Sequence, residues 1–174
     1  NRLTLSFPKV RRQIEEGLAA LVKEEFPQAE ALFGTSTAGI AHAAITAEIL
    51  GLPMGYVRGS AKDHGRQNQV EGKLGKGDKV VVVEDLISTG GSVLDCVKVL
   101  QENGAEVLGI VSIFTYGMQK GKDRLAEAKV VNHSLCDLDA LLPVAVEQGY
   151  IEKEEQEKLL RFRDNPSDES WREA

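Results

Sequence analysis

Apolar residues recur along this chain in two alternating patterns, which together predict a sheet covered by helices. Helical spacing of apolar residues among charged ones, as at Val10, Ile14 and Leu18, predicts amphipathic helices. Short continuous apolar runs, such as Lys79 to Val83, predict buried strands. The predicted helices span 8–26, 35–51, 88–103, 122–128, 139–148 and 152–163, and the predicted strands span 29–34, 53–58, 79–83, 107–114 and 130–135. Strands that alternate with helices indicate an α/β fold with a mainly parallel sheet and helices on both faces.

The polar, glycine-rich stretch from Gly59 to Asp78 shows neither pattern and is predicted to be a loop. A loop of this length is unusual in a compact domain unless it has a function. Ligands of parallel α/β sheets bind at the carboxyl ends of the strands. The segments that follow the predicted strands are therefore the candidates for a functional site.

The segment VVVVEDLISTGGS, from Val80 to Ser92, carries the most specific pattern. Its valines predict a central strand, and Glu84 and Asp85 are expected to project from the carboxyl end of that strand into the crevice. The small residues from Ser88 onward predict a turn that opens a helix, whose free amides form a phosphate-binding nest. Two acids before such a nest suit a ligand that carries both a ribose diol and a 5′-phosphate.

Simpler interpretations explain this segment less well. A structural turn with a serine N-cap does not account for two adjacent acids after a buried strand, followed by small residues. The segment is not a Walker A loop, which would end in Gly-Lys-Ser/Thr, and no G-x-G-x-x-G motif follows a predicted strand.

The segment resembles the signature of type I phosphoribosyltransferases, which binds phosphoribosyl diphosphate (PRPP). The resemblance implies the fold of that family, a central, mainly parallel sheet flanked by helices, with a flexible catalytic loop. It also implies that Glu84 and Asp85 hold the 2′- and 3′-hydroxyl groups of PRPP, and that the loop after them cradles the 5′-phosphate. The implied loop residues are Leu86, Ile87, Ser88, Thr89, Gly90, Gly91 and Ser92.

A second segment, YVRGSAKDHGRQNQVEG at residues 56–72, resembles the catalytic loop of orotate phosphoribosyltransferases. Arg58, Lys62 and His64 can each present a positive charge or a donor to a diphosphate leaving group, and the glycines allow a lid to hinge. A single lysine or histidine in a loop is usually a solvated side chain, but their spacing in a long glycine-rich loop favours a function. The resemblance implies that Lys62, His64 and Asp85 are catalytic and that Arg58 lies at the base of the loop.

A third segment, GTSTAGIAH at residues 34–42, places small residues between a predicted strand and a helix. It resembles the diphosphate-binding loop of the same family, formed by Ser36, Thr37, Ala38 and Gly39. The resemblance implies a non-proline cis peptide near Ser36 and Thr37. His42, one turn into the helix, is interpreted as a structural residue.

The resemblance extends over nearly the whole chain, because SIFTYG at residues 112–117 and the tail NPSDESWREA look like those of Gram-positive-type bacterial orotate phosphoribosyltransferases. It implies transfer of phosphoribosyl from PRPP to orotate in de novo pyrimidine (UMP) synthesis, with Ser88 near orotate. Mg²⁺ is the implied cofactor, held mainly by PRPP and water, with no direct protein ligand. The implied assembly is a homodimer whose catalytic loop acts across the interface.

The composition of the chain limits the number of domains, the class of partner and the cellular location that can be expected. The 174 residues, with 42% hydrophobic and 28% charged, fit one globular domain over residues 1–174. A net charge of −6 without a Lys/Arg run argues against a nucleic-acid partner, and no apolar run is long enough for a membrane span. The lack of an export signal favours the cytoplasm, where Cys96 and Cys136 are expected to be reduced. Relatives carry a base-covering segment before the point that corresponds to Asn1, so that segment is expected to be missing here.

Two other functions are compatible with a PRPP signature. One is a phosphoribosyltransferase for another base, such as a purine, against which the lid and the Asn-Gln-Val-Glu-Gly stretch argue. The other is a regulator that binds PRPP without catalysis, which would carry an added DNA-binding domain. Neither such a domain nor a basic face is visible in the sequence.

Overall fold

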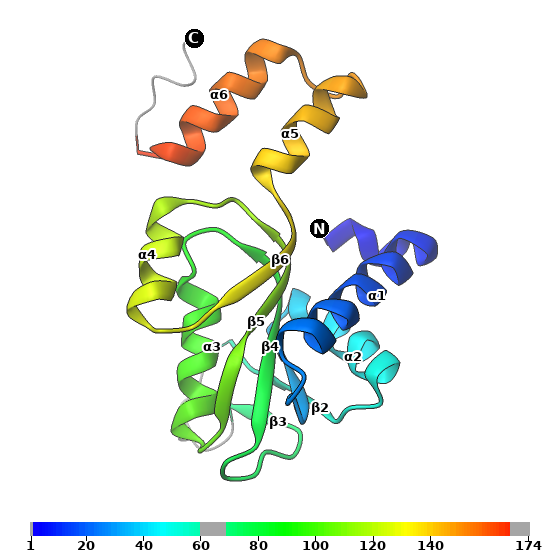
Figure 1. The fold of residues 1–174 in the computed structure, drawn as a ribbon, viewed down its shortest axis with the longest axis vertical. Helices are drawn as coiled ribbons and strands as arrows, with labels where there is room; N and C mark the ends of the chain where they lie inside the picture. Colours follow the sequence, from blue (N-terminus) through cyan, green and yellow to red (C-terminus); the bar gives the residue numbers. More distant parts are fainter. Residues whose placement is uncertain (1, 60–68, 168–174) are drawn as a thin grey trace.

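The computed structural model describes residues 2–59 and 69–167, so the predicted loop residues Lys62 and His64 lie outside the described residues. A six-stranded sheet in the order β3-β2-β1-β4-β5-β6 forms the centre of the molecule (Figure 1). Its strands are β1 (Ala31–Thr35), β2 (Met54–Val57), β3 (Val70–Glu71), β4 (Lys79–Ile87), β5 (Glu106–Thr115) and β6 (Asn132–Asp137). All neighbouring pairs are parallel except β2 and β3, which are antiparallel, so the predicted mainly parallel sheet is confirmed.

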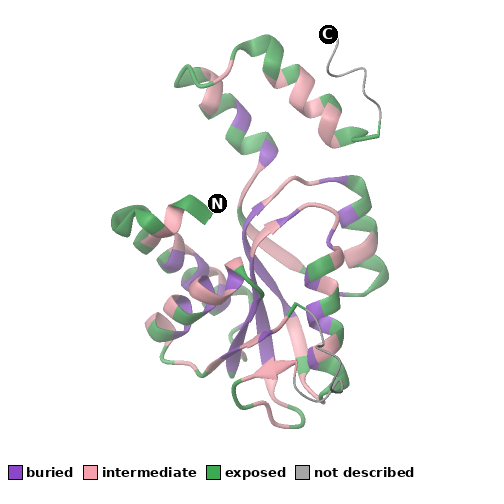
Figure 2. Cartoon of the chain, turned by 180° about the vertical axis from the view of Figure 1, so that it is seen from behind, coloured by how far each residue is buried: buried purple, intermediate pink, exposed green. Residues whose placement is uncertain are grey.

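Helices cover both faces of the sheet (Figure 1). On one face lie α1 (Pro8–Glu25) and α2 (Ala38–Leu50), and on the other α3 (Gly91–Glu102) and α4 (Gln119–Glu127). The central strand β4 supplies both sides of the core, because Val81 and Val83 pack with residues of α1 and α2 while Val80 and Val82 pack with residues of α3. All four valines are fully buried, and the centre of the sheet is buried throughout (Figure 2). A strand covered on both faces is apolar at every position, which explains the continuous valine run.

A helical hairpin lies beyond the carboxyl end of the sheet (Figure 1). It consists of α5 (Leu138–Glu147) and α6 (Lys153–Asp164), while a short 3-10 helix, η1 (Arg2–Ser6), precedes α1 at the other end of the chain. Leu138 and Leu142 of α5 pack with Phe114 near the end of β5. Arg163 of α6 binds both carboxylate oxygens of Asp139 at 2.5 and 2.6 Å, which joins the two helices of the hairpin.

The strand β4 is longer than predicted, and this corrects the expected position of the two acids. It continues to Ile87, because Leu86 pairs with Phe114 and Ile87 with Thr115 of β5. Acidic residues are unfavourable in strands, so the sequence pattern placed the end of the strand at Val83. Glu84 and Asp85 therefore lie within β4, rather than after it.

Other element boundaries also differ from the prediction. The strand β3 lies inside the segment predicted as a loop, where Val70 pairs with Val57 and Glu71 with Tyr56. A strand of two residues has no periodicity that a sequence could reveal. The helix α3 begins at Gly91 instead of Ser88, which leaves Ser88 to Gly90 as a turn. No helix in the described part of the chain is long and apolar enough to cross a membrane.

Candidate functional site

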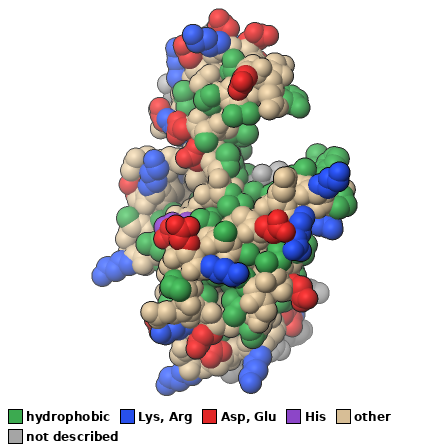
Figure 3. All heavy atoms as spheres, turned by 45° about the vertical axis from the view of Figure 1, so that its right-hand side comes forward, with side chains coloured by type: hydrophobic (Ala, Val, Ile, Leu, Met, Phe, Trp, Pro, Cys, Tyr) green, Lys and Arg blue, Asp and Glu red, His purple; other side chains and the backbone are tan. Residues whose placement is uncertain are grey.

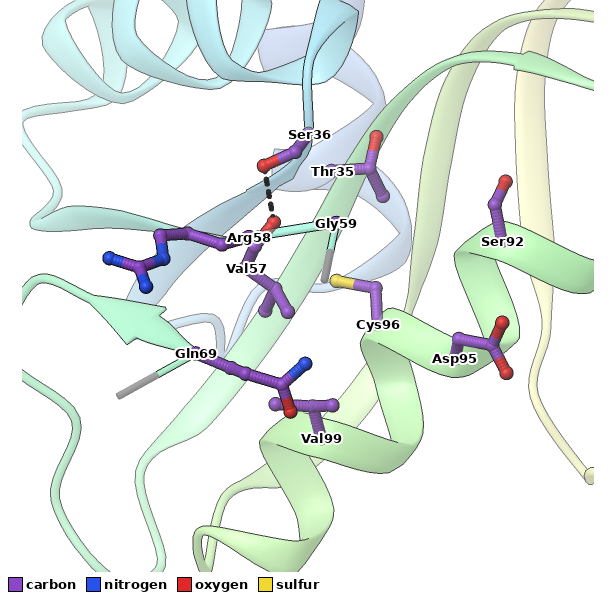
Figure 4. Close-up of a pocket in the computed structure, with 10 residues that line it drawn as sticks. All are labelled: Thr35, Ser36, Val57, Arg58, Gly59, Gln69, Ser92, Asp95, Cys96 and Val99. Carbon is purple, nitrogen blue, oxygen red and sulfur yellow. Dashed lines mark hydrogen bonds between the residues drawn. The ribbon is translucent and has the colours of Figure 1, made fainter. Parts of the chain in front are cut away.

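Two cavities with shared walls lie at the carboxyl ends of β1 and β4. The larger has a volume of about 440 Å³ and is lined by Arg2, Ser36, Thr37, Ala38, Glu84, Asp85, Leu86, Ser88 and Ser92. The smaller, of about 120 Å³, is lined by Thr35, Ser36, Val57, Arg58, Gly59, Gln69, Ser92, Asp95, Cys96 and Val99 (Figure 4). The structure thus brings two predicted site segments, the turn after β1 and the end of β4 with its loop, to the same cavity.

The turn after β1 is attached to both neighbouring strands. The Ser36–Thr37 peptide is cis, as the family resemblance implied. Ser36 Oγ donates a hydrogen bond to the Val57 carbonyl at the end of β2, at 2.5 Å (Figure 4). Gly39 lies against β4, since a Cβ at this position would be 2.5 Å from the Val83 carbonyl oxygen. This close approach requires glycine, so Gly39 determines where the turn lies.

Glu84 is a buried carboxyl group in the wall of the larger cavity, with a relative exposure of 5%. Its Oε1 accepts hydrogen bonds from Thr35 Oγ1 at 2.7 Å and from the Asp85 amide at 2.9 Å. Burial, with a smaller effect from the hydrogen bond to the Asp85 side chain, raises the pKa of Glu84 to about 7. Near neutral pH the group is therefore divided between acid and carboxylate, and in the carboxylate both oxygens act as acceptors only.

The segment from Leu86 to Ser92, called here the β4–α3 loop, comprises the last residues of β4, the turn of Ser88 to Gly90 and the start of α3. Gly90 occupies the N-cap position of α3 with φ of 74°, in the left-handed region that favours glycine. No side chain caps the first amides of this helix. Uncapped amides at the start of a helix, with the helix dipole behind them, attract anions. The loop therefore has the form of the predicted nest, while phosphate binding stays a prediction.

Arg58 lies immediately after β2, at the entrance to the segment that contains Lys62 and His64. Its amide donates to the Gln69 carbonyl at 2.8 Å, which brings the two ends of that segment together. Its Nη1 lies 3.0 Å from Glu71 Oε1, and its guanidinium is turned away from α3 (Figure 4). Arg58 thus lies at the base of the predicted catalytic loop, although its charge is paired with Glu71 in this structure.

The helix α3 contributes a wall of the smaller cavity that was not predicted from the sequence. Ser92, Asp95, Cys96 and Val99 form this wall. Their spacing of three and four residues places them on one helical face, so Ser92 was a signal that could have identified the others. Thr35 and Gln69 also line the cavity. Both lie in segments that the family resemblance covers, but neither was predicted to be a site residue.

Cys96 lies in this wall but is not a reactive nucleophile. Burial, and to a smaller extent the charge of Glu84, raises the pKa of the Cys96 thiol to about 12. Only the thiolate is nucleophilic, so this residue is a neutral packing group near neutral pH.

His42 lies outside both cavities and is fully buried between α1 and α2. Its Nδ1 is 2.6 Å from Glu15 Oε1, and Thr46 Oγ1 donates to Glu15 Oε2 at 3.0 Å. This placement agrees with the interpretation of His42 as a structural residue.

Comparisons with known proteins identify close relatives of the sequence. The family model described as a phosphoribosyl transferase domain matches residues 8–140. The orotate phosphoribosyltransferase of Bacillus cytotoxicus is 58% identical over 171 residues, which cover 98% of this chain and 81% of the relative.

Solved structures show the same similarity in three dimensions. The orotate phosphoribosyltransferase of Aeropyrum pernix matches with a TM-score of 0.74 at 30% identity, covering 86% of this chain and 82% of that one. That of Mycobacterium tuberculosis H37Rv in complex with PRPP matches with a TM-score of 0.65 at 24% identity, covering 79% of this chain and 78% of that one. The likeness to the Mycobacterium tuberculosis structure, at 24% identity, concerns the fold alone. Together they confirm the predicted fold class.

Proposed function

Since the chain belongs to the orotate phosphoribosyltransferase family, we propose that it transfers the phosphoribosyl group of PRPP to orotate. The products are orotidine 5′-monophosphate and diphosphate, in a step of pyrimidine synthesis. The observation that carries this proposal is the larger cavity, where Glu84 and Asp85 lie beside Ser88 and Ser92 of the β4–α3 loop. Two acids next to an uncapped helix start match a ligand that has a diol and a phosphate group.

In the proposed complex, PRPP lies across the carboxyl ends of β1 and β4. Glu84 and Asp85 accept hydrogen bonds from its 2′- and 3′-hydroxyl groups, and the β4–α3 loop binds its 5′-phosphate. The turn of residues 36–39 faces the diphosphate, and Ser88 contacts orotate. Arg58 and, from the segment outside the described residues, Lys62 and His64 complete the diphosphate site.

The proposed reaction needs positioning and charge stabilisation rather than a protein nucleophile. The bond between C1 of the ribose and the diphosphate oxygen breaks, and its electron pair leaves with the diphosphate. N1 of orotate forms the new bond to C1, and the proton of N1 is released to solvent. Cationic groups at residues 58, 62 and 64 would stabilise the departing diphosphate. Asp85, beside the ribose, would stabilise the positive charge that develops on the ring.

We further propose that Mg²⁺ accompanies PRPP. The described residues include no group of three or more His, Cys, Asp or Glu side chains that could hold a metal ion. Mg²⁺ usually keeps several waters and binds substrate phosphates through few protein ligands. A diphosphate-bound ion in the cavity would neutralise charge on the leaving group.

The proposed assembly is a homodimer in the cytoplasm. The family resemblance supports a dimer in which the segment with Lys62 and His64 serves the partner's site. PRPP and orotate would be the ligands, with neither a nucleic acid nor a membrane as partner.

The first experiment mixes the protein with PRPP, Mg²⁺ and orotate, and follows the loss of orotate absorbance and the release of diphosphate. We expect orotate to be consumed and adenine, guanine and hypoxanthine to be left unchanged. Consumption of a purine instead would show that the base is different. PRPP binding without diphosphate release would contradict catalysis by this chain and favour a PRPP-binding regulator, or a chain that needs a further segment for orotate.

A further inference from the structure

The helix α4 packs against the outer side of the β4–α3 loop. Gly121 contacts Ser88 so closely that a Cβ on Gly121 would lie 2.5 Å from the Ser88 carbonyl oxygen. One turn later, Arg124 Nη1 donates to the Thr89 carbonyl oxygen at 3.2 Å. The same nitrogen lies 3.5 Å from Thr89 Oγ1. Because residues three apart share a helical face, Gly121 and Arg124 hold two consecutive carbonyl groups of the loop against one side of α4.

This arrangement determines where the next two amides point. In a planar trans peptide the N–H group points opposite to the C=O group. With the Ser88 and Thr89 carbonyls directed at α4, the amides of Thr89 and Gly90 are directed away from it. Within the described ranges, neither amide donates a hydrogen bond to another protein group. Both amides are therefore oriented before any ligand binds.

Other features of the loop do not provide this orientation. The left-handed Gly90 allows the turn but has no side chain to restrain it. The first amides of α3 have no side-chain cap. Thr115 Oγ1 donates to the Ile87 carbonyl at 3.4 Å, but that contact precedes the turn. At the turn itself Arg124 contacts the Thr89 carbonyl, and this hydrogen bond is strengthened by the charge of Arg124. Donors fixed in advance bind an anion more tightly than donors that must be ordered on binding.

We propose that Arg124 is a positioning residue for the 5′-phosphate of the substrate. It holds the Thr89 carbonyl against α4, so that the amides of Thr89 and Gly90 are available to the phosphate, and it does not touch the substrate. The proposal rests on the proposed function, because it assumes that the β4–α3 loop binds the 5′-phosphate of PRPP.

The test compares Arg124→Ala and Arg124→Lys with Lys120→Ala, a matched control at an exposed position of the same helix. Two dissociation constants are measured. That of ribose 5-phosphate measures binding at the β4–α3 loop, and that of diphosphate measures binding at the rest of the PRPP site. We expect Arg124→Ala to weaken ribose 5-phosphate binding about tenfold, as for a lost charge-assisted hydrogen bond, and to leave diphosphate binding within about twofold. Lys120→Ala should change neither constant.

Two further readouts separate positioning from a general structural role. In assays of turnover, Arg124→Ala should raise KM for PRPP about tenfold and lower kcat much less, because the phosphate is held equally in ground and transition states. Low concentrations of guanidinium ion should restore ribose 5-phosphate binding to Arg124→Ala and leave Lys120→Ala unaffected. Arg124→Lys, which keeps the charge, should bind ribose 5-phosphate with intermediate strength. If the alanine variant does not fold, the lysine variant still tests the proposal.

The outcomes distinguish this inference from the proposed function. A wild-type protein that binds ribose 5-phosphate without consuming orotate would contradict the proposed function, and the comparison of variants would still test Arg124. Equal ribose 5-phosphate affinity in all variants would overturn the positioning role even if orotate is consumed. Parallel weakening of ribose 5-phosphate and diphosphate would also overturn it. A wild-type protein that does not bind ribose 5-phosphate would overturn the positioning role, and would overturn the proposed function as well if orotate is not consumed.

Discussion

At the scale of single residues, Glu84 couples the stability of the protein to the proposed chemistry. Its carboxyl group is buried beside Thr35, and its pKa of about 7 is well above the ordinary 4.5. In the unfolded chain the group would ionise at its ordinary pKa, so folding favours the protonated form. The ionised form of the same group is the stronger acceptor for the proposed hydrogen bonds from the ribose hydroxyl groups. Stability and substrate binding are therefore expected to respond to pH in opposite directions.

The first prediction concerns the pH dependence of Glu84. Because the folded pKa is raised, the stabilising contribution of Glu84 is fully present below pH 4.5 and is lost as pH rises through about 7. We expect Glu84→Gln, which cannot ionise, to gain on the order of 2 kcal/mol in unfolding free energy relative to the wild type between pH 5 and pH 8. Urea unfolding at a series of pH values measures this difference.

The activity of Glu84→Gln tests the same titration, because activity is expected to change with pH in the opposite direction to stability. For the wild type, kcat/KM for PRPP should rise as pH increases through about 7, and the Glu84→Gln profile should lack this rise. Identical stability and rate profiles for both proteins would show that Glu84 does not titrate in this range.

A second prediction concerns Glu15, whose buried carboxylate binds His42 and Thr46. Removal of one partner from a buried pair leaves the other without a hydrogen bond, so Glu15→Ala should lower the unfolding free energy by about 3 kcal/mol. The adjacent Glu16 is a matched control, because it forms an exposed pair with Arg12 and its loss should cost within about 0.5 kcal/mol. Urea unfolding measures both values, and equal losses would show that the buried pair has no special importance.

At the scale of elements, the proposed site is built where strands end and helices begin. The strand β4 carries Glu84 and Asp85 near its carboxyl end, and the chain continues directly into the β4–α3 loop. The helix α4 contacts that loop from outside through Arg124. The chemistry thus depends on β4, the β4–α3 loop and α4, whose relative positions come from packing on the sheet.

The third prediction concerns the segment that follows β2. Lys62→Ala should lower kcat roughly a hundredfold, the usual effect of losing one group that stabilises charge in the transition state. KM for PRPP should change by less than about fivefold, since this contact would form mainly as the diphosphate departs. Lys73→Ala, at an exposed position after β3, is the control. Initial rates at varied PRPP concentrations measure both constants, and an unchanged kcat would exclude the proposed catalytic role of Lys62.

At the scale of the whole molecule, the proposed dimer makes each site depend on two chains. The fourth prediction is that mixing Lys62→Ala with Asp85→Asn, each nearly inactive alone, restores activity. After unfolding and refolding together, random pairing should restore about one quarter of wild-type activity, because half of the dimers would contain one complete site. The control is a mixture of two proteins. One is the double variant, which carries both changes in one chain, and the other is heat-inactivated wild type.

The result of this mixing experiment bears directly on the assembly. Activity equal to the sum of the separate variants would contradict a loop that acts across the interface. Sedimentation or light scattering on the same samples would then show whether the protein is a dimer with independent sites or a monomer.

The sequence alone predicted the order of the elements except η1 and β3, the mainly parallel sheet, and the two candidate site segments at 36–39 and 84–92, whose ligand binding stays a prediction. These features are local, because the burial of a strand on both faces shows in its own residues and an anion-binding turn is formed by consecutive small residues. The end of β4 was missed because pairing with Phe114 and Thr115 of β5 carries the strand past its acids.

Tertiary structure decided the properties that depend on residues far apart in the chain. It buried Glu84 against Thr35 and so raised its pKa, it placed Asp95 and Cys96 in the wall of the smaller cavity, and it brought Arg124 to the loop at Thr89. Each of these depends on how helices and strands pack on one another. No local pattern specifies such packing, because desolvation and hydrogen-bond partners are set by the distance between elements rather than by the neighbours of a residue in sequence.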